Sequence, residues 1–177
     1  MSNLVKGEGP ESARIVLIGE APGKTEDVLH RPFVGASGNM LQDWWRDLGL
    51  SRGEVRIDNL LQFRPVGGKI ENASIEELVS GVHDLRQRIA RLHCPHVVVP
   101  TGNYATFALT GKGKVKTALR KALGEEVTAS EAEKKAGILR LRGSVYPYTT
   151  LTGHQCKLIP TIHPSWFFHG NMSKRGI

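Results

Sequence analysis

Two short loop segments, one near each end of the chain, each follow a run with the character of a strand. The run at 15–18 (IVLI) leads into the glycine- and proline-rich segment 19–23 (GEAPG), and the run at 157–161 (KLIPT) leads into 162–165 (IHPS). Ligands of open α/β sheets bind beyond the carboxyl ends of the strands. The two segments therefore favour a fold that brings both loops to one edge of a sheet.

Strand-like and helix-like patterns alternate along the sequence. Strands are expected at 12–18, 54–61, 96–100, 138–145 and 157–162. Helices are expected at 39–48, from an N-cap at Ser74 (with Glu77 placed for a capping box) to about 92, and at 103–109, 114–123 and 130–136. This alternation predicts an α/β fold, a three-layer α/β/α sandwich with a central, mostly parallel sheet. We expect one domain over 1–177, with a charged surface insertion at about 111–136.

The charge of the chain points to a polyanionic partner. The sequence has 24 lysines and arginines against 17 acidic residues, which gives a formal net charge of +7 and a pI near 9.6. No apolar run approaches the ~20 residues that span a bilayer, and residues 1–9 lack the apolar stretch of a signal peptide. We therefore expect a cytoplasmic protein that does not bind membranes.

The cysteine content argues against a metal centre. The two cysteines, Cys94 and Cys156, belong to no C-x-x-C or comparable ligand array. Cysteine-rich zinc and iron–sulfur sites need clustered thiolates at characteristic spacings. We interpret both residues as reduced thiols and expect no metal and no other cofactor.

Several motifs occur in a fixed order along most of the chain: GEAPG with Glu26-Asp27, RPFVG at 31–35 with Ser37-Gly38, Asp58-Asn59, Arg64-Pro65, and TIHPS at 161–165. Together they resemble the uracil-DNA glycosylase superfamily, above all its family-four type from bacteria and archaea. The resemblance implies a base excision repair enzyme that hydrolyses the N-glycosidic bond of uracil in DNA and leaves an abasic site. It also implies base flipping, because the reacting atoms are hidden inside the duplex.

The resemblance assigns recognition of the base to two side chains. Phe33 matches an aromatic residue that stacks on the flipped base, an interaction worth ~1–3 kcal/mol. Asn59 matches an asparagine that reads the Watson–Crick edge, because one amide offers both a donor and an acceptor to O4 and N3–H of uracil. The loop that approaches the base or a phosphate is expected to be shaped by Gly19, Ala21, Pro22 and Gly23.

Catalysis is expected from a histidine and a carboxylate. His163 matches the histidine that stabilises the negative charge developing at O2 of the leaving base. The best-known relatives carry an aspartate where this chain has Ala21, so another side chain has to orient the water. We expect Glu26 or Asp27 in that role ahead of Glu20, and the sequence leaves the choice open.

DNA contacts outside the pocket are expected from two parts of the chain. Ser165 would contact a backbone phosphate. Trp166 and the two phenylalanines after it are either a wedge that fills the gap left by the flipped base or part of the core. A basic stretch is expected to bind the DNA backbone without sequence preference through Lys112, Lys114 and Lys116.

The chain departs from family-four proteins in one respect. Those proteins usually hold a four-iron–four-sulfur cluster with four cysteines, and this chain has none at the matching positions. The place directly before Arg64-Pro65 is occupied by Phe63. We therefore expect no cluster, and we expect Phe63 to fill the space by apolar packing.

Three alternatives remain open. A glycosylase for another deaminated base, such as hypoxanthine, is favoured if Asn59 points away from the pocket. A catalytically inactive DNA-binding accessory protein is favoured if His163 and the carboxylates do not converge on the pocket of Phe33. A nucleotide-binding α/β domain is disfavoured, because no Lys-Ser or Lys-Thr pair follows the glycines. The family resemblance also implies a monomer.

Overall fold

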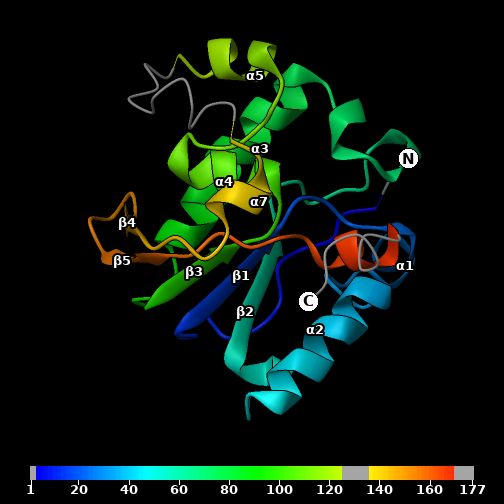
Figure 1. The fold of residues 1–177 in the computed structure, drawn as a ribbon, viewed down its shortest axis with the longest axis vertical. Coiled ribbons are helices and arrows are strands. Elements are labelled where there is room, and N and C mark those ends of the chain that lie inside the picture. Colours follow the sequence, from blue (N-terminus) through cyan, green and yellow to red (C-terminus); the bar gives the residue numbers. More distant parts are fainter. Residues whose placement is uncertain (1–2, 125–135, 170–177) are drawn as a thin grey trace.

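One five-stranded sheet runs through the centre of the molecule (Figure 1). The computed structural model describes residues 3–124 and 136–169. The strand order is β2-β1-β3-β5-β4, with β1 (Ile15–Gly19), β2 (Val55–Asn59), β3 (Val97–Pro100), β4 (Tyr146–Thr149) and β5 (Gln155–Leu158). Strands β2, β1, β3 and β5 are parallel, and β4 pairs antiparallel with β5. The predicted α/β fold with a mostly parallel sheet is confirmed.

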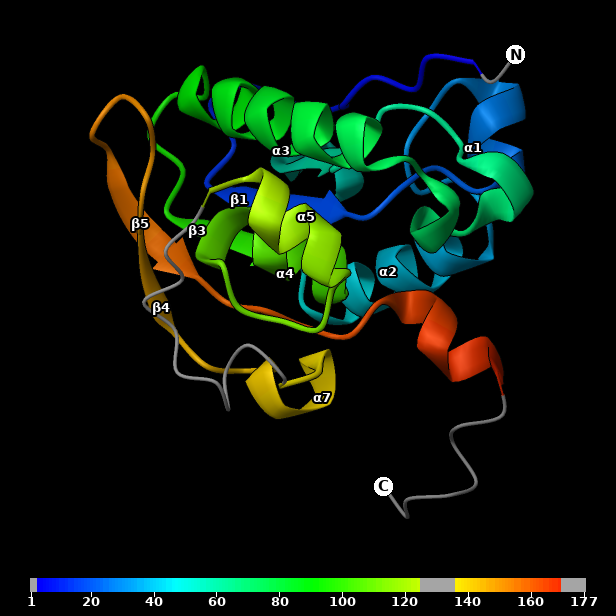
Figure 2. The same ribbon diagram turned by 90° about the horizontal axis from the view of Figure 1, so that it is seen from above.

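Helices join β1 to β2, β2 to β3 and β3 to β4, and the longest of the described helices, α3, runs alongside β1 (Figure 2). The α-helices among the described residues are α1 (Lys24–Leu29), α2 (Ala36–Asp47), α3 (Ile75–Ala90), α4 (Asn103–Thr110), α5 (Thr117–Ala122) and α7 (Ile138–Leu141). Short 3-10 turns are η1 (Arg52–Glu54), η2 (Val66–Gly68), η3 (Ile70–Asn72) and η4 (Pro164–His169).

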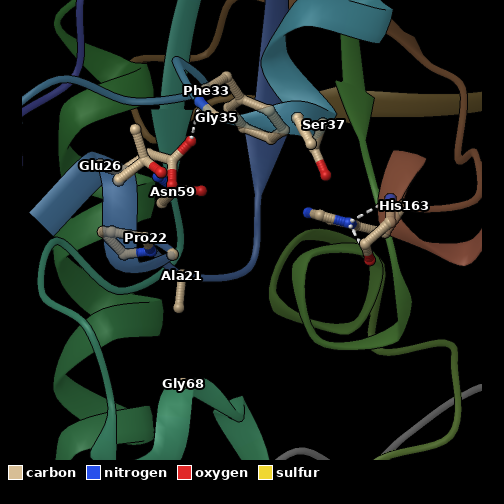
Figure 3. Close-up of a pocket in the computed structure, with 13 residues that line it drawn as sticks. Ala21, Pro22, Glu26, Phe33, Gly35, Ser37, Asn59, Gly68 and His163 are labelled. Atoms are coloured by element: carbon tan, nitrogen blue, oxygen red, sulfur yellow. Dashed lines mark hydrogen bonds between the residues drawn. The ribbon is translucent and has the colours of Figure 1, made fainter. Parts of the chain in front are cut away.

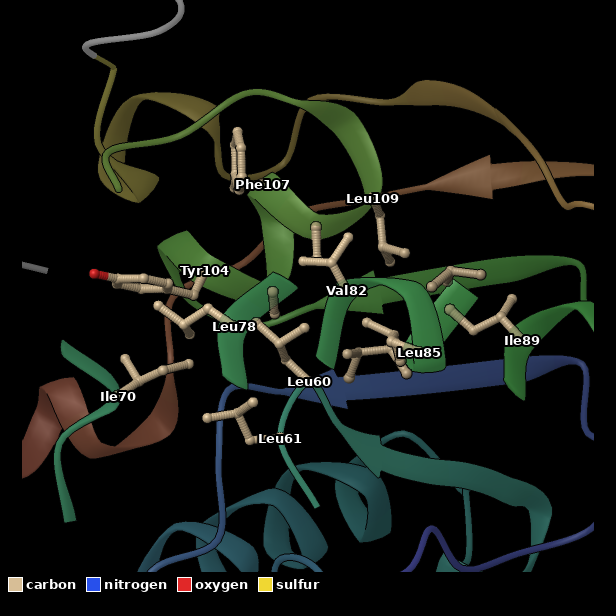
Figure 4. Close-up of a cluster of buried hydrophobic side chains, with 14 of the residues drawn as sticks. Leu60, Leu61, Ile70, Leu78, Val82, Leu85, Ile89, Tyr104, Phe107 and Leu109 are labelled. Carbon is tan, nitrogen blue, oxygen red and sulfur yellow. The ribbon is translucent and has the colours of Figure 1, made fainter. Parts of the chain in front are cut away.

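The two faces of β1 bury different residues, because successive side chains of a strand point to opposite sides. Val16 and Ile18 join a large apolar cluster with the inner sides of α3 and α4 (Figure 4). Leu17 packs on the other face with Leu41 and Trp45 of α2. Helices therefore cover both faces of the sheet, which makes the three predicted layers.

Helix α3 begins where the sequence predicts. The Ser74 hydroxyl accepts a hydrogen bond from the backbone N–H of Glu77 (3.1 Å), and the Glu77 carboxylate accepts one from the N–H of Ser74 (2.8 Å). This capping box satisfies two donors that a helix start otherwise leaves unpaired. Leu78, Val82 and Leu85 follow at helical spacing and are fully buried. The apolar residues that predict the helix are therefore the ones that pack it against the sheet.

The order of the strands creates a crevice at the carboxyl end of β1. From β1 the chain passes to β2 on one side and then to β3 on the other side of β1. Ligands of open α/β sheets bind at such a reversal. The loops that follow β1, β2 and β5 all reach this edge, because these three strands are parallel.

The segment 138–145 is predicted as a strand, and this prediction is wrong. Its first residues form helix α7, and strand β4 begins only at Tyr146. The backbone N–H of Ile138 donates to Oδ1 of Asn103 (2.9 Å), which holds the helix start. Gly143, at φ 75°, follows the helix in the left-handed conformation common after a helix end. A short run with alternating apolar residues fits one helical turn as well as a strand.

One unpredicted helix and one strand boundary also differ from the prediction. Helix α1 lies in the segment 19–38, for which the sequence predicts no helix. The last strand is expected at 157–162 but runs from Gln155 to Leu158, and Thr161 makes only an isolated bridge to Thr101.

The expected insertion at 111–136 is described in part. Helix α5 lies within it and packs against α3, with Leu119 fully buried. The helix expected at 130–136 lies outside the described residues except for Ala136. Within 3–124 and 136–169, no helix has the length and apolar character that a membrane crossing requires.

Candidate active site

Segments far apart in the sequence meet in one cavity of about 320 Å³ at the carboxyl edge of the sheet (Figure 3). This volume falls in the range of ~300–1,000 Å³ common for ligand sites. The predicted residues that line it are Ala21, Pro22, Gly23, Glu26, Phe33, Asn59, His163 and Ser165. The GEAPG and IHPS segments therefore share one site, together with the end of β2.

Phe33 is held in place by contacts from outside its own loop. It is 4% exposed, and its φ of 50° lies in the left-handed region that side chains rarely adopt. Arg52 donates from Nη1 to the Phe33 carbonyl (2.9 Å) and from Nη2 to the Pro32 carbonyl (2.6 Å). Glu8 accepts from Nε of Arg52 at 3.0 Å. These bonds stabilise a strained backbone and so fix the position of the ring.

Gly19 allows two of the predicted base-binding side chains to approach each other. A Cβ at this position would lie 2.2 Å from Oδ1 of Asn59 and 2.6 Å from ring atoms of Phe33. Any side chain larger than hydrogen would have to displace one of them. Gly19 is not part of the cavity lining, yet it permits the cavity's shape.

Asn59 lines the cavity at the end of β2. The residue is 2% exposed, and its side chain makes no hydrogen bond within the part of the chain that the structure describes. Its backbone is clamped: its N–H donates to Oδ1 of Asp58 (2.8 Å), and its carbonyl accepts from Nη2 of Arg88 (2.7 Å). Arg88 and Asp58 form an ion pair at 2.7 Å. The amide therefore has its donors and its acceptor available to a ligand.

Glu26 has one oxygen fixed and one oxygen available. Its Oε1 accepts hydrogen bonds from the backbone N–H groups of Val34 (3.0 Å) and Gly35 (2.7 Å). Its Oε2 lies toward Gly23 and has no hydrogen-bond partner among the described residues. The residue is 9% exposed and borders the cavity. A carboxylate held in this way can orient a water molecule.

The other two candidate carboxylates do not line the cavity. Asp27 accepts a hydrogen bond from the backbone N–H of Asn3 at 2.8 Å. Glu20 accepts one from the N–H of Tyr104 (2.8 Å) at the start of α4, and burial raises the pKa of this carboxyl to about 7. Of the three predicted carboxylates, the geometry favours Glu26 as the one that meets a substrate.

His163 faces the cavity as a neutral hydrogen-bond donor. Its Nδ1 accepts from the backbone N–H of Ser165 (3.2 Å) and lies 2.7 Å from the Ser165 hydroxyl. A backbone N–H only donates, so the proton of the neutral ring resides on Nε2. Burial lowers the pKa of His163 to about 4, while the nearby charge of Glu26 acts in the opposite direction. The imidazole also stacks near Phe33, with ring centres 5.8 Å apart.

The predicted DNA-binding aromatic residues form a small cluster beside the cavity. Trp166 does not line the cavity and packs edge-on against Phe167, which packs edge-on against Trp44 of α2. Phe168 is 49% exposed. Phe167 thus packs η4 against α2, as expected if this residue belongs to the core.

The three predicted lysines lie outside the cavity lining. Lys112 places Nζ 5.3 Å from the ring centre of Tyr146, and Lys116 donates from Nζ to the Ala73 carbonyl at 3.1 Å. Lys114 is exposed. Their contact with DNA stays a prediction.

Comparison with known protein families decides the relationship. The family described as "Uracil DNA glycosylase superfamily" matches residues 6–176. The chain belongs to the uracil-DNA glycosylase superfamily.

Three relatives show how similar this superfamily member is to proteins named type-4 uracil-DNA glycosylase. The protein of Saccharolobus solfataricus is 31% identical over 92% of this chain and 66% of its own length. The proteins of Thermotoga maritima and Pyrobaculum aerophilum are each 32% identical, over 98% and 92% of this chain and 76% and 72% of their own lengths. The predicted family is confirmed. The chain spans about two thirds to three quarters of the length of these relatives.

The residues of this superfamily member do not fit an iron–sulfur cluster. Cys94 is exposed and Cys156 is half-buried, and both are single free thiols. Phe63, at a position where a thiolate ligand is expected, packs against the large apolar cluster. Over 3–124 and 136–169, no three His, Cys, Asp or Glu side chains gather as a metal site. The chain lacks the four thiolates that such a cluster needs.

Some residues that shape the site carry no motif in the sequence. Arg52 supports Phe33 from the 3-10 turn η1, and Arg88 supports Asn59 from helix α3; both are distant along the chain from the residue they support. Gly38 has a weak signal, because it belongs to the Ser37-Gly38 part of the family resemblance. A Cβ there would lie 1.8 Å from the Phe33 carbonyl oxygen, so this glycine permits the turn that carries Phe33.

Proposed function

We propose that this protein hydrolyses the N-glycosidic bond of uracil in DNA and leaves an abasic site. One observation carries the proposal: Phe33, Asn59, Glu26 and His163 line a single cavity of about 320 Å³. The relatives named type-4 uracil-DNA glycosylase support the same reaction.

Recognition of the base follows from the ring and the amide. A uracil flipped out of the duplex would stack on Phe33, which offsets part of the flipping energy. The Asn59 amide would donate from Nδ2 to O4 and accept from N3–H at Oδ1. Cytosine offers the opposite pattern at these two atoms, so buried polar groups would stay unpaired at about 1–3 kcal/mol each.

Hydrolysis would proceed by attack of water at C1′ of the deoxyribose. Oε2 of Glu26 orients the water and takes its proton, and the electron pair of the C1′–N1 bond passes to the departing base. His163 donates its Nε2–H hydrogen bond to O2 of the uracil anion, where the negative charge collects. A neutral donor that is already aimed at this oxygen lowers the barrier, because the interaction strengthens as the charge develops.

The partner and setting belong to the same proposal. The net charge of +7 supports a DNA partner. Ser165 and Trp166 adjoin His163, beside the cavity that receives the base, and Lys112, Lys114 and Lys116 would contact the DNA backbone farther out. We propose a monomeric, single-domain protein that works in the cytoplasm on the nucleoid.

The experiment is excision from a labelled oligonucleotide with one uracil, followed by alkali cleavage of the abasic product. A matched oligonucleotide with hypoxanthine runs beside it. His163→Ala is compared with His83→Ala, which changes an exposed histidine of α3. Glu26→Gln is compared with Asp27→Asn, because these two neighbours are the competing carboxylates.

We expect uracil-dependent cleavage that falls at least 100-fold in the His163 and Glu26 variants, since removing one transition-state donor costs about 10²–10³ in rate. The His83 variant should keep the wild-type rate. Cleavage of hypoxanthine but not uracil would identify the glycosylase for another base. DNA binding without cleavage of either base would identify the accessory protein and refute the enzyme.

A further inference from the structure

Arg64, five residues after the end of β2, carries a guanidinium that has no partner among the described residues. No hydrogen bond or ion pair joins it to any residue of the described parts of the chain, and its Nε is buried without an acceptor. Buried donors in folded proteins are almost always paired. The arginines around it behave differently: Arg52, Arg56 and Arg88 each donate to a carbonyl or a carboxylate.

The position of Arg64 relates it to the active-site cavity. Its guanidinium lies against Gly68: a Cβ on Gly68 would be 2.9 Å from Nη2 and 3.4 Å from Nε. Gly68 itself lines the cavity that holds Phe33 and His163 (Figure 3). Gly67 and Gly68 have φ of 68° and 70°, so the turn that brings the backbone over the guanidinium depends on glycine. The charge therefore lies next to a residue of the cavity lining without itself lining the cavity.

We propose that Arg64 binds a phosphate of the DNA strand beside the flipped nucleotide. The inference rests on the proposed function, because a nucleotide whose base fills the cavity must run its sugar–phosphate chain over the rim. An arginine presents several donors in a planar fork that matches phosphate oxygens. No described carboxylate pairs with this guanidinium, so it keeps its full charge for the incoming phosphate.

The test is the salt dependence of DNA binding, measured by fluorescence anisotropy. The probe is a duplex with a tetrahydrofuran abasic-site analogue, which a glycosylase cannot cleave. The variants are Arg64→Gln and Arg64→Lys. The control is Arg91→Gln, which removes the same charge at the exposed C-cap of α3. This end of α3 lies near the start of β1, where His93 donates to the Glu11 carbonyl, and therefore at the opposite edge of the sheet from the cavity.

Each phosphate contact contributes about 0.9 to the slope of log K against log salt concentration. We expect Arg64→Gln to lower the slope by about 1 and Arg64→Lys to keep it, because lysine retains the charge. Between about 50 and 200 mM salt, the affinity of Arg64→Gln should then fall roughly threefold less than that of the wild type. Arg91→Gln should keep the wild-type slope.

A wild-type slope in Arg64→Gln overturns the proposal, as does an equal reduction in Arg91→Gln. Should Arg64→Gln fail to fold, Arg64→Met, which keeps the apolar stem, takes its place under the same criteria. Uracil excision is measured in parallel. A reduced slope in a protein that excises no base refutes the proposed function and leaves the phosphate contact standing. Normal excision with an unchanged slope supports the proposed function and refutes the phosphate contact.

Discussion

Gly19→Ala tests whether the close approach of Phe33 and Asn59 makes the pocket. The added methyl group would lie 2.2 Å from Oδ1 of Asn59 and 2.6 Å from two ring atoms of Phe33. Both are far below a normal carbon contact of about 3.5–4.0 Å. The clamped backbone of Asn59 and the strained backbone of Phe33 leave little room to relax. One of the two side chains must therefore move by on the order of 1 Å.

Such a displacement sets the expected magnitude. A misplacement of about 1 Å at a reacting site lowers the rate by about 100-fold. Overpacking a buried position destabilises a fold by about 1–3 kcal/mol, which for a chain of this size lowers Tm by about 2–12 °C. We therefore expect Gly19→Ala to stay folded at room temperature and to lose most of its activity.

The assay is single-turnover excision of uracil at saturating enzyme, with thermal unfolding measured on the same samples. Gly53→Ala is the matched control, because a Cβ there meets only Oγ of Ser51, at 4.0 Å. It should keep the wild-type rate and Tm. A Gly19→Ala protein that excises uracil at the wild-type rate would refute the reasoning, even if its Tm were lower, since the two side chains would not need their present positions.

Three further predictions follow from the contacts of the site. Because burial lowers the pKa of His163 to about 4, the limb of the kcat/KM profile that His163→Ala removes should lie near pH 4; a limb near 6.5 would contradict a neutral donor. Burial raises the pKa of Glu20 from 4.5 to about 7, so its protonated form stabilises the fold below about pH 4.5 and this contribution is lost as the pH rises through 7. In urea unfolding, the free energy of unfolding of the wild type should therefore fall by roughly 3 kcal/mol over this pH range, and Glu20→Gln should remove that fall. Arg52→Met leaves the carbonyls of Pro32 and Phe33 unpaired, so excision should fall about tenfold and stability by about 1–3 kcal/mol, with partial rescue in Arg52→Lys; equal rates in both variants would show that Arg52 does not position the ring.

The elements with local signals are predicted well from the sequence. The apolar run of β1 and the capping box of α3 depend on residues that are neighbours in the chain, and both are found close to the expected positions. The segment 138–145 fails because its helical start depends on the side chain of Asn103, which the fold brings from α4. Alternation of apolar residues carries no information on such a contact.

The choice among the three carboxylates could not be made from the sequence. Glu26 and Asp27 are adjacent, and adjacent residues of a helix point in different directions. Only the placement of α1 against the loop at 33–35 shows that Glu26 faces inward, onto the N–H groups of Val34 and Gly35. The motif predicts which residues gather at the site, whereas the packing of a short helix decides which one borders the cavity.

The ion pair beneath Asn59 positions this residue more than it stabilises the fold. The side chains of Asp58 and Arg88 are 5% and 20% exposed, and removing such charges from water offsets most of their attraction. Their hydrogen bonds explain why an apolar pair would not serve as well. Arg88 donates to the Asn59 carbonyl, and Asp58 accepts from its N–H, so both charges hold the backbone of one residue. For the proposed discrimination of bases by the direction of two hydrogen bonds, the Asn59 amide has to be held in one position, and the ion pair holds the backbone of this residue from the opposite side of β2.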